Sequence, residues 1–298
     1  MTNPQPSTHE WGTQPEMFGP RMEHRLRMIL RETARIPRNG TVLDAAVGLG
    51  QLGQRMRSQG LCVFGVDGAF AAALHATREA GVPSVVGDLT ALPFLNGVFA
   101  GVTSGETLEH LDDDAAAVLE LGRVMASGGR CVVTVPALES LRSFSDTYYE
   151  HRRRYSRNGL RALFERSRFR VLAARFWGFP VVLAYDTFFL LPMNRRRARA
   201  KPEEDASLRS VAKAGQSRLL VSLVRLVFGI DRLFGFVPFG PGLLLVASKE
   251  PSDLQAAGSA VREDEQTDFP GNRRSGGPSL AEGCSRRKRS GRVMTENS

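Results

Sequence analysis

Short apolar runs alternate with amphipathic segments through the first 135 residues. The run 61–66 is apolar throughout and ends at Asp67, as expected for a parallel strand that is covered on both faces. The segment 21–35 instead carries apolar residues at helical spacing, and 70–80 is rich in alanine and ends before Gly81. This alternation predicts a parallel sheet with helices on both faces. Strands are expected at 42–44, 61–66, 84–86, 98–104 and 130–135, and helices at 21–35, 51–58, 70–80 and 112–125.

Polar residues follow four of these expected strands, namely Asp44, Asp67, Asp88 and Ser104. Open parallel sheets bind ligands beyond the carboxyl ends of their strands, so these residues predict a binding site at one edge. An aspartate after a strand can also serve only as a turn or helix-cap residue, and that alternative stays open for each of them.

A glycine turn, with Gly48, Gly50 and Gly53, connects the first strand to the following helix. Glycine lets the backbone approach a ligand closely, and the helix start offers unpaired N–H groups to an anionic or strongly polar group. The spacing matches the dinucleotide fingerprint, with Asp67 in the place of the ribose-binding acid. A nicotinamide-dependent oxidoreductase is therefore one hypothesis.

Four further features resemble another family. Asp44 precedes the glycine turn, Asp88 lies in the block GDLTALPF, Glu109 and His110 lie in TLEHL, and Gly128 follows in SGG. Together they resemble class I S-adenosylmethionine-dependent methyltransferases. The resemblance implies a Rossmann-like, mostly parallel seven-stranded sheet with helices on both faces and an α-helical cap inserted before the last strand.

The resemblance also implies a role for S-adenosyl-L-methionine as cofactor. The residue matching Asp67 binds both ribose hydroxyls in that family, the residue matching Asp88 holds the adenine amino group, and the backbone around Gly48 and Gly50 holds the methionine end. The full set of expected cofactor-binding residues is Asp44, Ala46, Gly48, Gly50, Asp67, Gly68, Asp88, Leu89 and Ser104.

The chain departs from the family pattern at two positions. Ala46 stands where the first motif glycine is usual, and Ala100 stands where an aspartate is usual. Alanine at position 46 is tolerable if its φ is negative, although its Cβ narrows the approach to the cofactor. A scaffold that binds the cofactor but has lost catalysis is therefore a third hypothesis.

The second half resembles a bacterial subgroup of the family, the methyltransferase type 11-like proteins. The segments 145–155, 160–169 and 238–249 are similar to its GHxRRY stretch, a following helix and its last strand. Subgroup members commonly occur with polysaccharide, lipid or secondary-metabolite enzymes, which implies a small-molecule, saccharide or lipid-linked acceptor.

Methyl transfer from a sulfonium is an in-line displacement that needs alignment and exclusion of water, and a base only if the acceptor loses a proton. His151, His110 and Asp146 are the catalytic candidates, because neutral imidazole is available near pH 7. A structural role for each histidine is the alternative. No metal site is expected, since the three cysteines lack metal-ligand spacing.

The net charge of +9 is concentrated in residues 151–200, which carry thirteen arginines against Glu165 and Asp186. Such a segment favours contact with phosphate, anionic lipid or an acidic substrate, and the alternative is a solvated basic face. Nucleic acid is not expected as a partner, because no nucleic-acid-reading motif accompanies the charge.

The domain organisation follows from composition. Residues 1–20 are expected to be flexible, 21–250 to form the methyltransferase domain with a helical cap at 178–238, and 251–298 to be disordered. The wide apolar face of 217–234 must be covered by the acceptor pocket, by a membrane surface or by a dimer partner. The N-terminus lacks the pattern of a signal peptide, which predicts a cytoplasmic protein, peripheral to the inner face of the membrane if lipid is bound.

Overall fold

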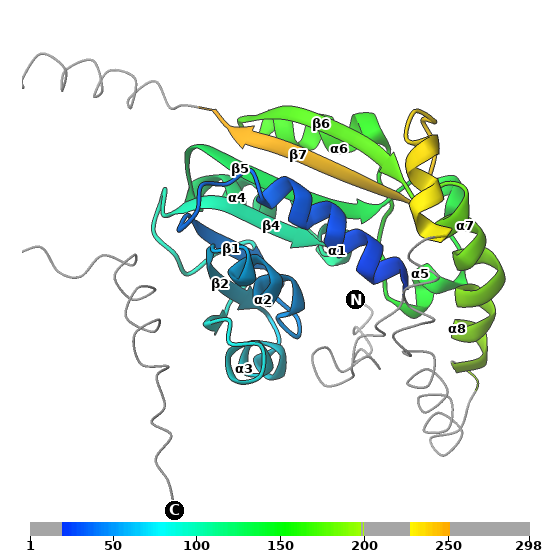
Figure 1. Ribbon diagram of the computed structural model, residues 1–298, viewed down its shortest axis with the longest axis horizontal. Helices are drawn as coiled ribbons and strands as arrows, with labels where there is room; N and C mark the ends of the chain where they lie inside the picture. Colours follow the sequence, from blue (N-terminus) through cyan, green and yellow to red (C-terminus); the bar gives the residue numbers. More distant parts are fainter. Residues whose placement is uncertain (1–19, 198, 200–226, 251–298) are drawn as a thin grey trace, which may run out of the picture.

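The computed structural model describes residues 20–197, 199 and 227–250, which fold around one seven-stranded sheet (Figure 1). The strand order is β3-β2-β1-β4-β5-β7-β6, and the first five strands are parallel while β7 runs antiparallel to both β5 and β6. The expected seven-stranded, mostly parallel sheet is thus confirmed. The strands are β1 Thr41–Ala45, β2 Cys62–Asp67, β3 Ser84–Val86, β4 Phe99–Gly105, β5 Met125–Pro136, β6 Phe169–Trp177 and β7 Gly242–Lys249.

The helices of the first half lie close to their expected ranges. The α-helices are α1 Pro20–Thr33, α2 Gln51–Ser58, α3 Phe70–Arg78, α4 Asp114–Val124, α5 Phe144–Tyr148, α6 Arg157–Arg166, α7 Val181–Tyr185 and α8 Leu191–Arg197. Short 3-10 turns occur at η1 Leu108–His110, η2 Glu139–Leu141 and η4 Gly229–Phe234, and a π-helical turn at η3 Asp186–Leu190.

Neighbouring residues of one strand enter different hydrophobic cores, one on each face of the sheet. Val42 packs with α1 and α2, whereas Leu43 packs with α4 and α6. Leu244 and Leu245 of β7 divide in the same way. Burial on both faces explains the continuous apolar runs of the inner strands, and each fully buried Val or Leu stabilises the fold by roughly 1.5 to 3 kcal/mol.

Two strands differ from the sequence expectation. β5 begins five residues early, because Met125 pairs with Phe99 ahead of a register shift between Phe99 and Gly101. β6 was not placed from its residue pattern, and its one partner strand, β7, lies about seventy residues later in the chain. A strand at the edge of a sheet does not have to be apolar on both faces. Because many residues of β6 are half-exposed, its sequence predicts a strand only weakly.

Helices α5, α7 and α8 gather at one end of the sheet, beyond the carboxyl ends of the parallel strands (Figure 1). The described parts of the proposed cap at 178–238 are helical, but residues 198 and 200–226 lie outside the described residues, as does most of the predicted helix at 217–234. Of the expected flexible segments 1–20 and 251–298, residues 1–19 and 251–298 also lie outside them, while Pro20 begins α1. Among the described helices none has the length and apolar character needed to cross a membrane.

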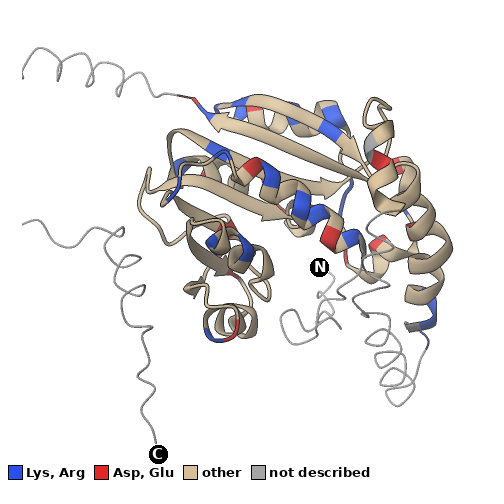
Figure 2. Ribbon diagram, viewed as in Figure 1, with Lys and Arg blue, Asp and Glu red and all other residues tan. Residues whose placement is uncertain are grey.

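The basic segment does not form one uninterrupted positive face. Figure 2 shows acidic residues interspersed with the basic ones over the described fold. Several of the expected arginines form ion pairs with acids from other elements: Arg152 with Asp112, Arg153 with Asp114, Arg154 with Asp146, and Arg175 with Glu32. Part of the excess charge therefore holds the fold together.

Candidate functional site

The turn after β1 is built around Asp44, which is buried and accepts a hydrogen bond from Thr103 Oγ1 of β4 at 2.8 Å. Gly48 and Gly50 follow with φ of 51° and 80°, a left-handed conformation that glycine adopts without strain. Gly50 is the N-cap residue of α2. The expected strand, glycine turn and helix are all present.

Two of the three motif glycines are required by packing. A Cβ at Gly50 would lie 2.6 Å from Cβ of Ala80, and one at Gly53 would lie 2.9 Å from Cγ2 of Val82. Both distances are too short for real contacts, so these glycines allow α2 to approach the chain around α3. The dinucleotide-like spacing is therefore explained in part by packing.

Ala46 adopts a positive φ of 62°. The condition under which alanine would be tolerated here, a negative φ, is not met. The chain turns sharply because Val47 N–H donates to the carbonyl of Val66 at 3.0 Å, and this bond holds the turn against β2. A left-handed conformation costs an L-residue about 1 to 2 kcal/mol, so Ala46 is a strained position.

Asp67 closes β2 and fastens the glycine turn. Its Oδ2 accepts the amide N–H of Gly48 and its Oδ1 accepts that of Ala69, both at 2.9 Å. Each carboxylate oxygen can accept a second hydrogen bond, so the group retains capacity for a ligand hydroxyl. Gly68 beside it is exposed, with open space where a Cβ would lie.

Asp88 has the geometry of a turn-forming acid. It is exposed, and its Oδ1 accepts the amide N–H of Thr90 at 2.8 Å. That backbone hydrogen bond lowers the pKa of the Asp88 carboxyl. Leu89 next to it is buried in the core. These contacts support the alternative in which Asp88 is a turn residue. The part of its carboxylate that does not bind Thr90 lies at the surface.

The carboxyl end of β4 carries Ser104 and then Glu106, which the sequence did not single out. Ser104 is buried, and its hydroxyl has no hydrogen-bond partner among the described residues. Glu106 pairs with Arg21 at 3.5 Å and with Arg25 at 3.7 Å. Burial raises the pKa of Glu106, but the two guanidinium groups outweigh it and lower the pKa overall. Because Arg21 and Arg25 belong to α1, more than eighty residues away, no local pattern signals these pairs.

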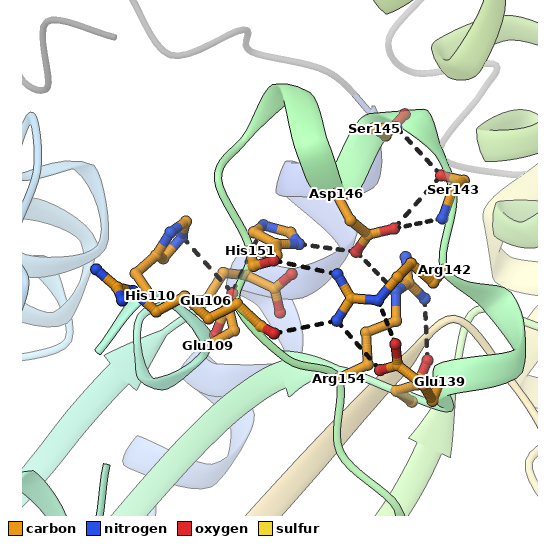
Figure 3. Close-up of polar contacts among 12 residues, drawn as sticks. Glu106, Glu109, His110, Glu139, Arg142, Ser143, Ser145, Asp146, His151 and Arg154 are labelled. Atoms are coloured by element: carbon orange, nitrogen blue, oxygen red, sulfur yellow. Dashed lines mark hydrogen bonds and ion pairs between the residues drawn. The ribbon is translucent and has the colours of Figure 1, made fainter. Parts of the chain in front are cut away.

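The three catalytic candidates do come together (Figure 3). His151 Nδ1 lies 3.0 Å from Asp146 Oδ1, and the two histidine rings of His110 and His151 meet edge to face, 5.0 Å apart. Asp146 is fully buried and also accepts hydrogen bonds from Arg154 Nε at 2.7 Å and from the Ser143 amide at 2.7 Å. Burial raises the pKa of Asp146, but these bonds from His151, Arg154 and Ser143 outweigh it, so its pKa lies far below its usual range.

Glu109 lies between the two histidines. Its side chain is fully buried, and neither carboxyl oxygen makes a hydrogen bond with any described residue. Its Oε1 is 4.0 Å from Nε2 of His110 and 4.0 Å from Nε2 of His151. Burial, and then the charge of Glu106, raise the pKa of Glu109, while burial and His151 lower the pKa of His110 to about 4.

No metal site was expected from the sequence, but the fold brings three potential metal-ligating side chains together. One potential ligand atom from each of Glu109, His110 and His151 lies within 4.8 Å of the others. The Glu-His pair was visible in the sequence, but His151 follows forty-one residues later and reaches the pair only through the tertiary fold.

Two cavities flank the Glu106 ion pairs. The first, about 50 Å³, is lined by the β1 turn and α1: Arg25, Asp44, Ala46, Leu49, Gln51 and Gly105. The second, about 110 Å³, has a lining that includes the polar residues Arg21, Asp146, His151, Arg154 and Asp186. Its apolar lining residues include Leu141, Leu183, Leu190 and Leu191. Since Arg25 lines one cavity and Arg21 the other, the Glu106 ion pairs connect one lining residue of each cavity.

Asp67 and Asp88 line neither cavity, and the first cavity is smaller than the several hundred Å³ of a typical ligand site. A ligand as large as S-adenosylmethionine would therefore have to extend from this cavity over the outer surface of the turn toward Asp67.

Known proteins share both the fold and part of the sequence. Residues 43–133 match the family model of a methyltransferase domain. The demethylmenaquinone methyltransferase of Mycolicibacterium vanbaalenii is 33% identical over 126 residues, which cover 42% of this chain and 54% of that protein. The ubiquinone/menaquinone biosynthesis C-methyltransferase UbiE of Desulfotalea psychrophila is 29% identical over 137 residues, 43% of this chain and 56% of that protein. The chain spans about half the length of the curated relatives it matches.

Solved structures show the same fold at lower sequence identity. A putative sarcosine dimethylglycine methyltransferase from Galdieria sulphuraria superimposes with a TM-score of 0.54 at 15% identity, covering 77% of this chain and 86% of that one. Geranyl diphosphate methyltransferase in complex with GPP and sinefungin gives 0.51 at 19% identity, with 76% and 77% covered.

The sheet order, the strand-end acids and the glycine turn define a class I methyltransferase fold. Residues 43–133, which match the family model of a methyltransferase domain, lie within this fold, so this part of the chain is similar to S-adenosylmethionine-dependent methyltransferases, and S-adenosylmethionine is the cofactor of that class. The nicotinamide hypothesis gains no support from these matches.

Proposed function

We propose that this chain transfers a methyl group from S-adenosylmethionine to a small-molecule acceptor held in the second cavity. The observation that carries the proposal is that Glu106 pairs with one lining residue of each cavity, Arg25 of the first and Arg21 of the second. We place the methyl donor at the β1 turn and the acceptor near His151, on either side of these ion pairs. In the reaction the bond between the methyl carbon and sulfur breaks, a bond to the acceptor atom forms, and S-adenosylhomocysteine leaves.

The cofactor is assigned to the β1 turn and the end of β2. Asp67 keeps acceptor capacity for the ribose hydroxyls after it binds the amides of Gly48 and Ala69. Asp44, Ala46 and Gly48 are assigned to the methionine end because they form or adjoin the first cavity. Asp88 and Leu89 are assigned to the adenine, with Ser104 and Gly68 at the margins of the site.

The second cavity supports an acceptor with a polar head and an apolar part. Its lining combines charged groups, including Arg154 and Asp186, with leucines such as Leu183 and Leu190. Two of the relatives are named for quinone biosynthesis, and a quinol combines a polar ring with a hydrocarbon tail. We therefore place quinols and lipid-linked compounds of similar amphiphilic character first among the acceptors.

Removal of a proton from the acceptor is assigned to the cluster of His151, His110 and Asp146. Asp146 accepts from Nδ1 of His151, which fixes the ring and directs Nε2 inward with its lone pair. In such a displacement, most of the rate acceleration comes from alignment of the reactants by the residues that line the cavity. The imidazole contributes only where the acceptor atom must lose a proton.

The test is calorimetry followed by turnover. S-adenosylhomocysteine should bind with saturation and NADH should not. Production of S-adenosylhomocysteine from S-adenosylmethionine should then rise when a reduced quinol is added. Binding of NADH would overturn the assignment, and cofactor binding without turnover on any amphiphilic acceptor would leave a silent scaffold as the better description.

A further inference from the structure

We propose that Glu109, His110 and His151 form a binding site for a divalent transition-metal ion of the zinc type. The site lies beside the acceptor cavity, which His151 also lines. The three side chains supply one carboxylate oxygen and two imidazole nitrogens whose ligand atoms lie within 4.8 Å of one another (Figure 3). Two histidines and one carboxylate, with a remaining position for substrate, are the ligand set of many catalytic zinc sites.

Glu109 provides the first argument. A carboxyl group that is buried without a hydrogen-bond partner is costly, and such groups are usually paired or coordinate a metal. Glu109 is fully buried, neither of its oxygens makes a hydrogen bond with a described residue, and Oε1 is directed at both Nε2 atoms. A metal ion between these atoms would supply the missing partner.

The support around His151 provides the second argument. Histidines that bind metal ions commonly donate their other ring N–H to a carboxylate, which fixes the tautomer and aims the ligand nitrogen. Asp146 plays this part for His151 at 3.0 Å, and it is itself held by the Ser143 amide and by Arg154. The arrangement leaves Nε2 as the ligand atom of His151.

Metal binding would require the three ligand atoms to move only slightly closer together. Ligands at roughly 2.0 to 2.1 Å from a tetrahedral ion lie about 3.3 Å from one another. The present separations of 4.0 Å between Glu109 Oε1 and the two Nε2 atoms would therefore close by somewhat less than 1 Å each. Because His151 also lines the second cavity, the open coordination position would face the acceptor.

The local charges indicate what would fill that position. Glu106, Asp146 and Asp186 are balanced by Arg21, Arg25 and Arg154, so Glu109 alone would offset the charge of a divalent ion. The remaining positive charge favours an ionised oxygen on the acceptor. With the ion bound, His151 Nε2 is a ligand and not a base, so the ion takes over the activation of an acceptor hydroxyl. This role rests on the proposed methyl transfer, whereas the binding of the ion does not.

The experiment uses the full chain stripped with a chelator and titrated with Co²⁺ alone, which absorbs visible light strongly when bound in a tetrahedral site. We expect saturable absorption that Zn²⁺ abolishes. Glu109→Gln should weaken Co²⁺ binding by about 100-fold or more, and Asp146→Asn by about 10- to 100-fold through loss of the aimed imidazole. Glu139→Gln, which alters an exposed glutamate paired with Arg142, is the matched control and should bind as the parent does.

S-adenosylhomocysteine binding, measured in the same samples, separates this proposal from the proposed function and confirms that each variant is folded. The metal proposal is overturned if Co²⁺ gives no tetrahedral absorption, or if Glu109→Gln binds Co²⁺ as tightly as Glu139→Gln. Loss of S-adenosylhomocysteine binding with intact Co²⁺ binding would instead contradict the proposed function.

Discussion

Gly48 donates its amide N–H to Oδ2 of Asp67 at 2.9 Å, which ties the turn after β1 to the end of β2. The same carboxylate accepts the amide of Ala69 through Oδ1. We therefore propose two functions for Asp67 that a sequence motif does not separate: it shapes the backbone of the glycine turn, and it offers acceptor capacity to the cofactor.

Replacing Asp67 tests both functions. Asp67→Ala should weaken S-adenosylhomocysteine binding by about 1.5 to 3 kcal/mol, the range for a charged hydrogen-bonding group that is removed. Asp67→Asn keeps one acceptor oxygen for a backbone amide and should preserve the thermal stability better than Asp67→Ala. Calorimetry and thermal unfolding measure the two effects, and an unchanged affinity in Asp67→Ala would mean that the ribose is held elsewhere.

Ala46 offers a test of backbone strain. Ala46→Gly should raise the free energy of unfolding by about 0.5 to 1 kcal/mol, because glycine relieves the strain of a positive φ but loses more chain entropy on folding. The matched control is Ala45→Gly, one residue earlier in β1. This substitution should lower the free energy of unfolding by a similar amount, because glycine in a strand loses more chain entropy on folding. Urea unfolding compares the two, and equal destabilisation by both substitutions would show that position 46 is unstrained.

Asp146 should make stability depend on pH in the acid range. Its pKa is lower in the folded chain than in the unfolded chain, so its contribution is fully present above the ordinary value of about 4 and is lost as the pH falls toward the folded value. Asp146→Asn should therefore cost about 3 kcal/mol or more at pH 7, because Arg154 loses a buried partner. The difference from the parent should shrink below pH 4 in urea unfolding, and a constant difference between pH 7 and pH 3 would contradict this assignment.

The end of α8 combines charge with exposed aromatic side chains. Arg195 and Arg196 are exposed, and Phe188 and Phe189 one to two turns earlier are 81% and 57% exposed. We expect the protein to co-sediment with anionic but not zwitterionic vesicles at low salt, since attraction to surface charge is screened over about 10 Å at 0.1 M salt. Changing Arg195, Arg196 and Arg197 together to Gln should abolish most of this binding, and equal partitioning to both vesicle types would exclude the electrostatic mechanism.

The segment 251–298 follows β7, which ends at Lys249. Its sequence offers no periodic apolar face that a core could bury. We expect removal of these residues to leave the melting temperature and the affinity for S-adenosylhomocysteine unchanged. A fall of several degrees in the melting temperature would show that the segment packs on the domain.

The fold class could be predicted from the sequence, and so could the strand ends to which we assign the cofactor. Strands that are buried on both faces must be apolar throughout, so β1, β2 and β4 are visible as runs, and their ends are marked by Asp44, Asp67 and Ser104. These signals are local, because each depends on residues within one element or one turn.

The acceptor side was decided by the tertiary structure. Glu106 meets Arg21 and Arg25, and Glu109 meets His151, across separations that no periodicity encodes. The positive φ of Ala46 likewise follows from hydrogen bonds between β1 and β2. Burial and hydrogen bonding then set the chemistry of two carboxyl groups. Glu109 has no hydrogen-bond partner among the described residues and has a raised pKa, while Asp146 is held by three donors and has a lowered pKa. Residue type specifies what a group can do, but its solvation and its neighbours, which only the folded chain brings together, determine its charge and its role.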